Sequence, residues 1–361
     1  MPRAVHTYTI AIHPDDYTPS YEPPLEDSAS SRWALYLQGA GHTVRWVDVR
    51  RPDILDQLQG CDAFMWRWAH FDGMGRIARR LLPVVEHELG LLVYPDQNTC
   101  WHYDDKIAQA YLLKAAGIPT PQTWVWFDRT AALDWASEAP YPLVLKLASG
   151  AGSTNVRLVH DAQESRAWIA HLFAHRVLSL DDGPRPGGNL LHRAADAARL
   201  LVRGSIPALR DNGREPQTGY VLFQQFLPDN AYDTRVNIIG NRAWARRRHN
   251  RPDDFRASGS NLLDRDPSGI DLGFVRLAFR VAQALSLQSC SIDGLYDGDR
   301  HTLCEISYTT PCWGQHRCPG HWVLEGEPET GRLHWVEGHM WGEQAQIEDL
   351  LTALGRRNRG A

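Results

Sequence analysis

The sequence predicts an α/β protein built from two or three compact units. Its 361 residues exceed the size that one hydrophobic core usually supports. Strand and helix patterns alternate over the first hundred residues, which is typical of βαβ units with a parallel sheet. Further along, two pairs of strand patterns are each joined by a tight glycine turn, which predicts antiparallel hairpins.

The first hundred residues predict a parallel sheet with helices packed on it. Ser28 is the expected N-cap of the first helix, and Pro83 is expected to kink the second. We expect strands at 5–13, 43–49, 62–68 and 91–94, with helices at 28–41 and 75–90.

The middle third predicts a helix and then short strands. Asp104 and Asp105 favour the start of a helix over 103–117, because acidic side chains stabilise the positive end of a helix dipole. We expect a strand at 121–127, a helix at 129–139 and paired strands at 143–147 and 155–159. Residues 176–219 are rich in Arg, Gly and Pro, and predict an insertion with one amphipathic helix over about 189–203. The insertion is either a surface loop or a lid over a site.

The last third predicts a sheet made of hairpins. We expect a strand at 220–227, a hairpin turned at Gly240-Asn241, a helix at 273–287, a second hairpin turned at Asp297-Gly298, and a final helix at 343–357.

Composition disfavours several classes of protein. The net charge of −5 argues against a dedicated nucleic-acid binder. The six cysteines form no framework of short spacings, so we expect reduced thiols and a cytoplasmic location. No apolar run is long enough for a signal peptide or a membrane span, so we expect no membrane partner.

Lysine is scarce, and this makes each lysine informative. Of 38 basic residues, only Lys106, Lys114 and Lys146 are lysines. Lys146 lies in a buried-looking strand, where an ammonium is costly unless an anion meets it. The strand runs into the turn "SGAGSTN", whose Gly150 and Gly152 allow backbone N–H groups to approach a phosphate. Lys146 and this turn together predict an anion site.

Two carboxylates are expected to face each other in the second hairpin. A turn at Asp297-Gly298 places Asp293 opposite 304 or 305, and therefore near Glu305. Two carboxylates this close repel unless a cation or a proton lies between them. Either they hold Mg²⁺ beside phosphates, or they are solvated acids at a sheet edge.

Arginines gather around the first hairpin. Strand alternation puts Asp233, Arg235 and Asn237 on one face, and the hairpin brings Arg246 or Arg247 near Arg235. Arg256 follows shortly after. Clustered guanidinium groups need anionic partners such as a triphosphate or an acyl phosphate. The alternative is a solvated basic strand.

Tryptophan and histidine are dense in "MWRWAHFD", "TCWHYDD" and "TTPCWGQHRCPGHW". These stretches either line a substrate pocket or pack in the core. Cys312, His316, Cys318 and His321 have a spacing that allows a zinc site, or else belong to a substrate loop.

The order of these motifs resembles the ATP-grasp ligase superfamily, and within it the ribosomal-protein glutamate ligases. The resemblance covers roughly residues 95–310. It includes "NTCWHYDDKIAQAYLLKAAGIPTPQTWVW", "PLVLKLASGAGSTNVRLV", "LFQQFLPDNAYDTRVNIIGNRAWARRR", "DDFRAS" and "IDGLY…LCEISYTTP". It implies an N-terminal parallel βαβ domain followed by two α+β lobes that sandwich the nucleotide. The implied domains are 1–97, 98–222 and 223–361.

The resemblance also implies roles for individual residues. Lys106 and Lys146 would hold the ATP phosphates, and Asp233 would meet the ribose. Arg235 and Arg256, with Lys146, would act on the transferred phosphoryl or acyl group. The residues implied for the glycine loop and the adenine-binding hinge are Gly150, Gly152, Ser153, Gln224, Gln225, Phe226 and Leu227.

Magnesium or manganese is implied at Asp293, Glu305 and Ser307. Two departures from the family stand out. Gln225 occupies a hinge position that is usually Glu, and both expected asparagines are serines, Ser258 and Ser307. A hydroxyl binds Mg²⁺ more weakly than an amide oxygen does, so one metal site is expected to be looser.

The implied activity is ATP-dependent formation of an amide or peptide bond through an acyl phosphate. The substrates would be small-molecule or peptide carboxylates and amines, and a homodimer is possible. Two alternatives stay open: a kinase on the same scaffold, and a non-catalytic nucleotide-binding module, which the serine replacements suggest.

Overall fold

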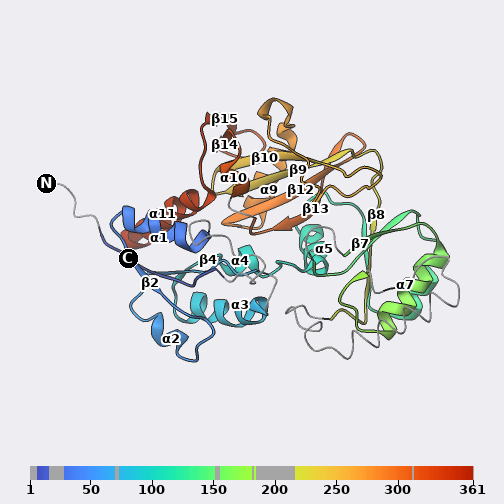
Figure 1. Cartoon of the computed structure of the whole chain (residues 1–361), viewed down its shortest axis with the longest axis horizontal. Coiled ribbons are helices and arrows are strands. Elements are labelled where there is room, and N and C mark those ends of the chain that lie inside the picture. Colours follow the sequence, from blue (N-terminus) through green and yellow to red (C-terminus); the bar gives the residue numbers. More distant parts are fainter. Residues whose placement is uncertain are drawn as a thin grey trace.

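Three sheets follow one another along the chain (Figure 1). The computed structural model describes residues 6–15, 28–69, 73–150, 155–180, 183, 216–310 and 313–360. The predicted helix over 189–203 lies outside these residues. No helix among the described residues is long and apolar enough to cross a membrane.

The N-terminal sheet is parallel, with strand order β2-β1-β3-β4. Its elements are β1 (Thr9–Ile12), α1 (Ala29–Gly39), β2 (Thr43–Trp46), α2 (Ile54–Gln57), β3 (Ala63–Met65), α3 (Met74–Pro83), the π-helical turn Val84–Glu88, β4 (Leu92–Tyr94) and α4 (Gln97–Cys100). Ser28 caps α1 as expected, because its side chain accepts a hydrogen bond from the Ser31 amide. Pro83 ends the α-helical part of α3. The sheet is buried on both faces, as parallel sheets usually are.

The middle sheet is antiparallel, with strand order β5-β8-β6-β7. Its elements, with the helix that precedes it, are α5 (Lys106–Ala115), β5 (Thr123–Trp126), α6 (Arg129–Trp135), β6 (Leu143–Lys146), β7 (Val156–Val159), α7 (Ala162–Ala174) and β8 (Val221–Gln225). Because β8 pairs with β5 and β6, we propose that the middle domain ends after Gln225 rather than after residue 222.

The large sheet has seven strands in the order β13-β12-β9-β10-β14-β15, with β11 paired to β10. Its elements are β9 (Tyr232–Ile239), β10 (Arg242–His249), β11 (Leu263–Asp264), α9 (Leu272–Ala284), β12 (Ser289–Asp297), β13 (Arg300–Ser307), α10 (Trp313–His316), β14 (Gly320–Glu325), β15 (Arg332–Glu337) and α11 (Gly342–Gly360). The first hairpin turns at Gly240-Asn241 as predicted. The second turns at Gly298-Asp299, one residue later than predicted, because Asp297 still pairs with Arg300.

The two faces of the large sheet differ in chemistry. One face is apolar and packs on α9, through residues such as Val236, Ile238 and Ile292. The other carries the alternate residues of β9, namely Asp233, Arg235 and Asn237. This polar face looks toward the rest of the chain, and it positions the candidate site.

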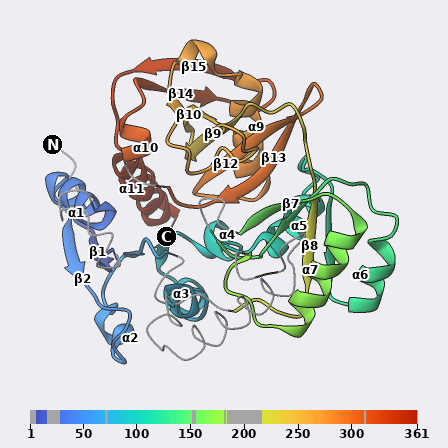
Figure 2. The ribbon, with the colours of Figure 1, turned by 45° about the vertical axis from the view of Figure 1, so that its right-hand side comes forward.

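Helix α11 returns to the N-terminal sheet. Its Ile347, Leu350 and Leu354 pack with Trp33 of α1, and the Trp33 indole donates to Gln346 Oε1 at 2.7 Å. Figures 1 and 2 show α11 between α1 and the large sheet. This contact ties the two ends of the chain together.

Candidate functional site

A cavity of about 380 Å³ lies between the middle sheet and the polar face of the large sheet. Its lining includes Val144, Lys146, Val156, Gln224, Gln225, Phe226, Leu227, Asp233, Phe255, Arg256, Ser258, Asp293, Leu295, Cys304 and Glu305. One part of the wall is apolar, where Phe226 and Phe255 meet edge to face at 5.6 Å. The other part is charged, which suits a ligand with a flat ring and an anionic tail.

Lys146 lines this cavity, and Lys106 lies beside it. Lys106 begins α5, where Asp105 caps the helix, and its Nζ lies 2.9 Å from Gly150 O and 3.3 Å from Glu305 Oε1. Lys146 ends β6. Both lysines line a second, smaller cavity between them. Burial opposes the charged form of Lys106, but the nearby carboxylates of Glu305 and Asp104 outweigh it and raise the pKa of the ammonium.

The side chain of Gln224 orients Lys146. The Lys146 Nζ donates to Gln224 Oε1 at 2.6 Å and lies 3.4 Å from Cys304 Sγ. Gln224 Nε2 in turn donates to Thr123 Oγ1 at 3.1 Å. Burial raises the pKa of the Cys304 thiol, so this sulfur stays neutral. In this structure the Gln224 side chain therefore binds the lysine, and Gln224 lines the cavity together with the hinge residues that follow it.

The glycine turn lies between β6 and β7 in the chain, and its described end is hydrogen-bonded to the segment that begins α5. The Gly150 amide donates to Asp104 Oδ1 at 2.8 Å. Gly150 has φ +128°, and an added Cβ would lie 2.8 Å from Asn155 Nδ2. Only glycine fits there. Gly152 and Ser153 lie outside the described residues.

Asp293 and Glu305 face each other across β12 and β13, as predicted. Asp293 is held by two guanidinium groups: Arg235 binds it at 2.6 and 2.7 Å, and Arg248 at 2.7 Å. Burial opposes ionisation of Asp293, but the two arginines together outweigh it and hold the pKa of the carboxyl below its usual range. Glu305 is 36% exposed and faces the cavity.

The other predicted site residues occupy different places around the cavity. Asp233 lines it but is paired with Arg248, whose Nε lies 2.6 Å from Asp233 Oδ1. Arg256 also lines it and binds Asp254 at 2.8 to 3.0 Å. The Ser307 hydroxyl donates to Thr309 O at 2.8 Å, so in this structure it points into its own loop.

Arg248 is the main residue that the sequence prediction left out. It bridges Asp233 and Asp293, and so ties β10 to β9 and β12. The signal was present in the sequence. Pairing of Arg246 with Arg235 places Arg248 on the same face as Arg246, because strand residues two apart share a face.

The aromatic stretches mostly pack in the core. Trp66 and Trp68 are fully buried in the N-terminal unit. His316 stacks on Trp341 at 3.9 Å, and His321 on Trp244 at 5.1 Å, so these two imidazoles have separate neighbours. No group of three metal-binding side chains occurs among the described residues. Cys312 lies outside them.

No family model matches the sequence. A segment of 63 residues, 18% of this chain, is 35% identical to the alpha-aminoadipate–LysW ligase LysX of Saccharolobus solfataricus, and it spans 23% of that ligase. A RimK domain ATP-grasp protein from Sphaerobacter thermophilus is 17% identical over 82% of this chain and 90% of its own, with a TM-score of 0.46. The N5-carboxyaminoimidazole ribonucleotide synthetase of Thermotoga maritima is 14% identical over 88% of this chain and 80% of its own, with a TM-score of 0.50.

The chain has the ATP-grasp fold. The predicted mixed α/β fold class is thereby confirmed. In this fold, the cavity lies between the middle sheet and the large sheet, the two lobes that the resemblance expected to enclose a nucleotide.

Proposed function

We propose that this protein is an ATP-dependent ligase that joins a carboxylate to an amine. Both substrates are small molecules or peptides. The carboxylate oxygen attacks the γ-phosphorus of ATP, which forms an acyl phosphate and releases ADP. The amine then attacks the acyl carbon, and the products are an amide, phosphate and a proton.

The convergence of Lys106 and Lys146 carries the proposal. They are two of three lysines in the chain, both are buried, and both line one small cavity beside the larger one. Glu305 already meets Lys106, but Lys146 makes no ion pair with any described carboxylate, and a buried ammonium is costly without an anion. The triphosphate of ATP supplies that anion, and the adenine base of the same ATP lies against Phe226 and Leu227.

Each residue then has a role in the proposed reaction. Lys106 and Lys146 hold the phosphates, with the backbone of the loop around Gly150, Gly152 and Ser153. The hinge, from Gln224 through Gln225 to Leu227, binds adenine, and Asp233 meets the ribose. Arg235 and Arg256 stabilise charge on the transferred group, as cations do for phosphoryl transfer generally.

The carboxylates fit a divalent cation. Mg²⁺ prefers one or two carboxylates together with phosphate oxygens. Glu305 faces the cavity, and the three guanidinium contacts of Asp293 leave about one of its roughly four acceptor positions. Asp293 and Glu305 would hold Mg²⁺ or Mn²⁺, with Ser307 contributing only after its hydroxyl turns. When bound, the cation neutralises phosphate charge.

The test is product analysis with ATP, Mg²⁺ and pooled carboxylates and amines. The proposal predicts ADP and phosphate in equal amounts, and only when a carboxylate–amine pair is present. ADP without phosphate indicates the kinase alternative. AMP with pyrophosphate indicates an adenylating enzyme. Nucleotide binding without turnover for any pool indicates a non-catalytic module. Each of these three results contradicts the ligase proposal.

A further inference from the structure

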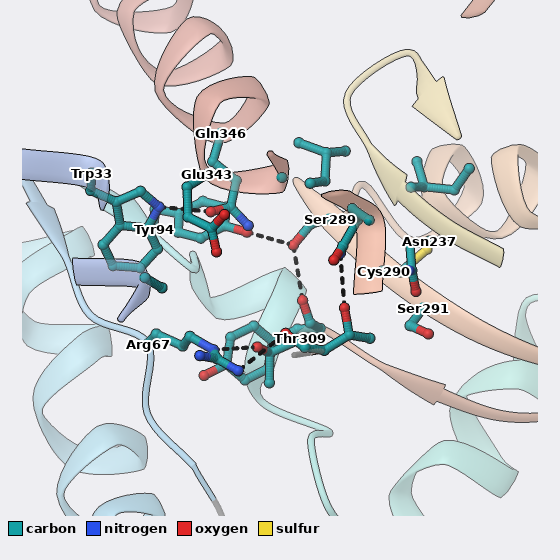
Figure 3. A pocket seen from close by; sticks show the side chains of 17 residues that line it. Trp33, Arg67, Tyr94, Asn237, Ser289, Cys290, Ser291, Thr309, Glu343 and Gln346 are labelled. Atoms are coloured by element: carbon teal, nitrogen blue, oxygen red, sulfur yellow. Dashed lines mark hydrogen bonds between the residues drawn. The ribbon is translucent and has the colours of Figure 1, made fainter. Parts of the chain in front are cut away.

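The polar face of the large sheet borders two cavities of very different size. The cavity beneath α11 measures about 20 Å³, which is room for about one water molecule, and the buried carboxylate of Glu343 lines it (Figure 3). The cavity between the middle sheet and the large sheet measures about 380 Å³. Of these two cavities, only the larger has room for a nucleotide.

Four carboxylates line the larger cavity: Asp229, Asp233, Asp293 and Glu305. Asp293 and Glu305 pair with cationic side chains at 2.6 to 3.3 Å. Asp233 is 8% exposed, and Arg248 binds both of its oxygens, at 2.6 and 2.5 Å. Asp229 is exposed, and its carboxylate has no hydrogen-bond or ion-pair partner among the described residues. Of the four carboxylates, Asp229 is therefore the one that a ligand can use without breaking an ion pair.

Asp229 lies in the turn that follows the hinge. Pro228 and Asp229 form this turn, and Asp229 has φ +64°. A turn position with positive φ is usually glycine or asparagine, because most side chains are strained there. Aspartate tolerates this backbone, but its oxygens accept no hydrogen bond from the described backbone around it. The turn therefore does not depend on the carboxylate, which leaves the carboxylate available for a ligand.

The turn is anchored on two sides, so the carboxylate of Asp229 is held beside the cavity. The Asn230 side chain binds both backbone groups of Tyr296 in β12: Oδ1 accepts from the amide at 2.8 Å, and Nδ2 donates to the carbonyl at 3.0 Å. Asn250, just after β10, donates from Nδ2 to Asn230 O at 2.7 Å. An acceptor that is already positioned loses little conformational entropy when a ligand binds.

The ribose is the part of ATP that suits this carboxylate. A carboxylate repels phosphates, so it needs a hydrogen-bond donor, and the donors of ATP at neutral pH are the adenine amino group and the ribose hydroxyls. The proposed function places adenine on the hinge, against Phe226 and Leu227, and the phosphates at Lys146. The ribose joins the base to the phosphates, so its hydroxyls are the donors left for Asp229.

We propose that Asp229 accepts hydrogen bonds from the 2′ and 3′ hydroxyls of the ribose of bound ATP, and that it is the main ribose ligand, beside Asp233. The two oxygens of a carboxylate match two neighbouring hydroxyls. This contact selects ribonucleotides over deoxyribonucleotides, because a missing hydroxyl leaves a charged acceptor without its donor. The inference rests on the proposed function, which puts ATP in this cavity.

The experiment is calorimetric titration of the full chain with the Mg²⁺ complexes of ATP, 2′-deoxy-ATP and 3′-deoxy-ATP. The wild type should bind ATP at least about 10-fold more tightly than either deoxynucleotide, the loss expected for a hydrogen bond to a charged group. Asp229→Gly should weaken ATP binding by about 10-fold or more and reduce the preference to within about twofold. Glycine suits φ +64°, so the turn is retained.

Asp253→Gly is the matched control. Asp253 is also exposed and has φ +57°, but it does not line the cavity. This variant should keep the affinity and the preference of the wild type. Asp229→Asn keeps the size of the side chain and also tolerates a positive φ, so it removes the charge without changing the turn. It should lose part of the preference, because hydrogen bonds to a neutral acceptor are weaker.

Two results overturn the ribose contact and leave the proposed function standing. One is a wild type that binds ATP and both deoxynucleotides within about twofold of one another. The other is a folded Asp229→Gly variant that keeps the wild-type preference for ATP. A wild type that binds no ATP at all contradicts the proposed function itself, and the ribose contact with it.

Discussion

Replacing Lys146 by Met tests the phosphate site most directly. Lys146 is buried, and its Nζ donates to Gln224 Oε1 at 2.6 Å. Methionine keeps an unbranched apolar stem of similar length, so packing changes little. The substitution removes the ammonium that meets the phosphates and leaves the Gln224 oxygen without this donor. A hydrogen bond to a charged group contributes about 1.5–3 kcal/mol, and each ~1.4 kcal/mol is a tenfold change in affinity. We therefore expect ATP to bind about 10- to 100-fold more weakly.

The assay is calorimetric titration with ATP and Mg²⁺, with circular dichroism to confirm folding. Lys114→Met is the matched control, because Lys114 is an exposed lysine in the last turn of α5. It should bind ATP like the wild type. A folded Lys146→Met variant whose dissociation constant stays within about twofold of the wild type would refute the assignment of the phosphate site.

Three further predictions follow. Asp293→Asn should destabilise the fold by about 3 kcal/mol at neutral pH, measured by urea unfolding, because it leaves Arg235 without its carboxylate and Arg248 with Asp233 alone. Since the folded pKa of Asp293 is lowered, its contribution is complete above its ordinary pKa of about 4 and is lost as the pH falls below it. Thermal midpoints between pH 7 and pH 3 should therefore fall less steeply in Asp293→Asn than in the wild type, and equal slopes would contradict the ion-pair geometry. Gly150→Ala should lower the free energy of unfolding by about 1–3 kcal/mol and weaken ATP binding, because the φ of +128° at Gly150 suits only glycine and the new methyl group meets Asn155. An unchanged ATP affinity would argue against a role for the turn in binding. Ser28→Ala should lower the unfolding free energy by about 1 kcal/mol through loss of the helix cap, with ATP affinity unchanged.

Local geometry could be predicted from the sequence because it depends on spacing alone. Alternation along a strand placed Asp233, Arg235 and Asn237 on one face, and the hairpin brought Asp293 opposite Glu305. The turn of the second hairpin was predicted one residue too early, because Asp297 still pairs with Arg300 and so belongs to the strand. β14 and β15 were missed, because their period was obscured by a stretch rich in Gly, His and Trp.

Tertiary packing alone decided the partners of the charged groups. Lys106 and Lys146 come from different elements, and only the docking of α5 against β13 and the middle sheet brings both to one cavity. The same holds for Arg248 on Asp293, and for the cavity that α11 closes over Asn237 and Ser291. Spacing within a strand or hairpin follows from backbone geometry, which every chain shares. Contacts between distant elements depend on how whole apolar faces pack, and this packing cannot be predicted from any single motif.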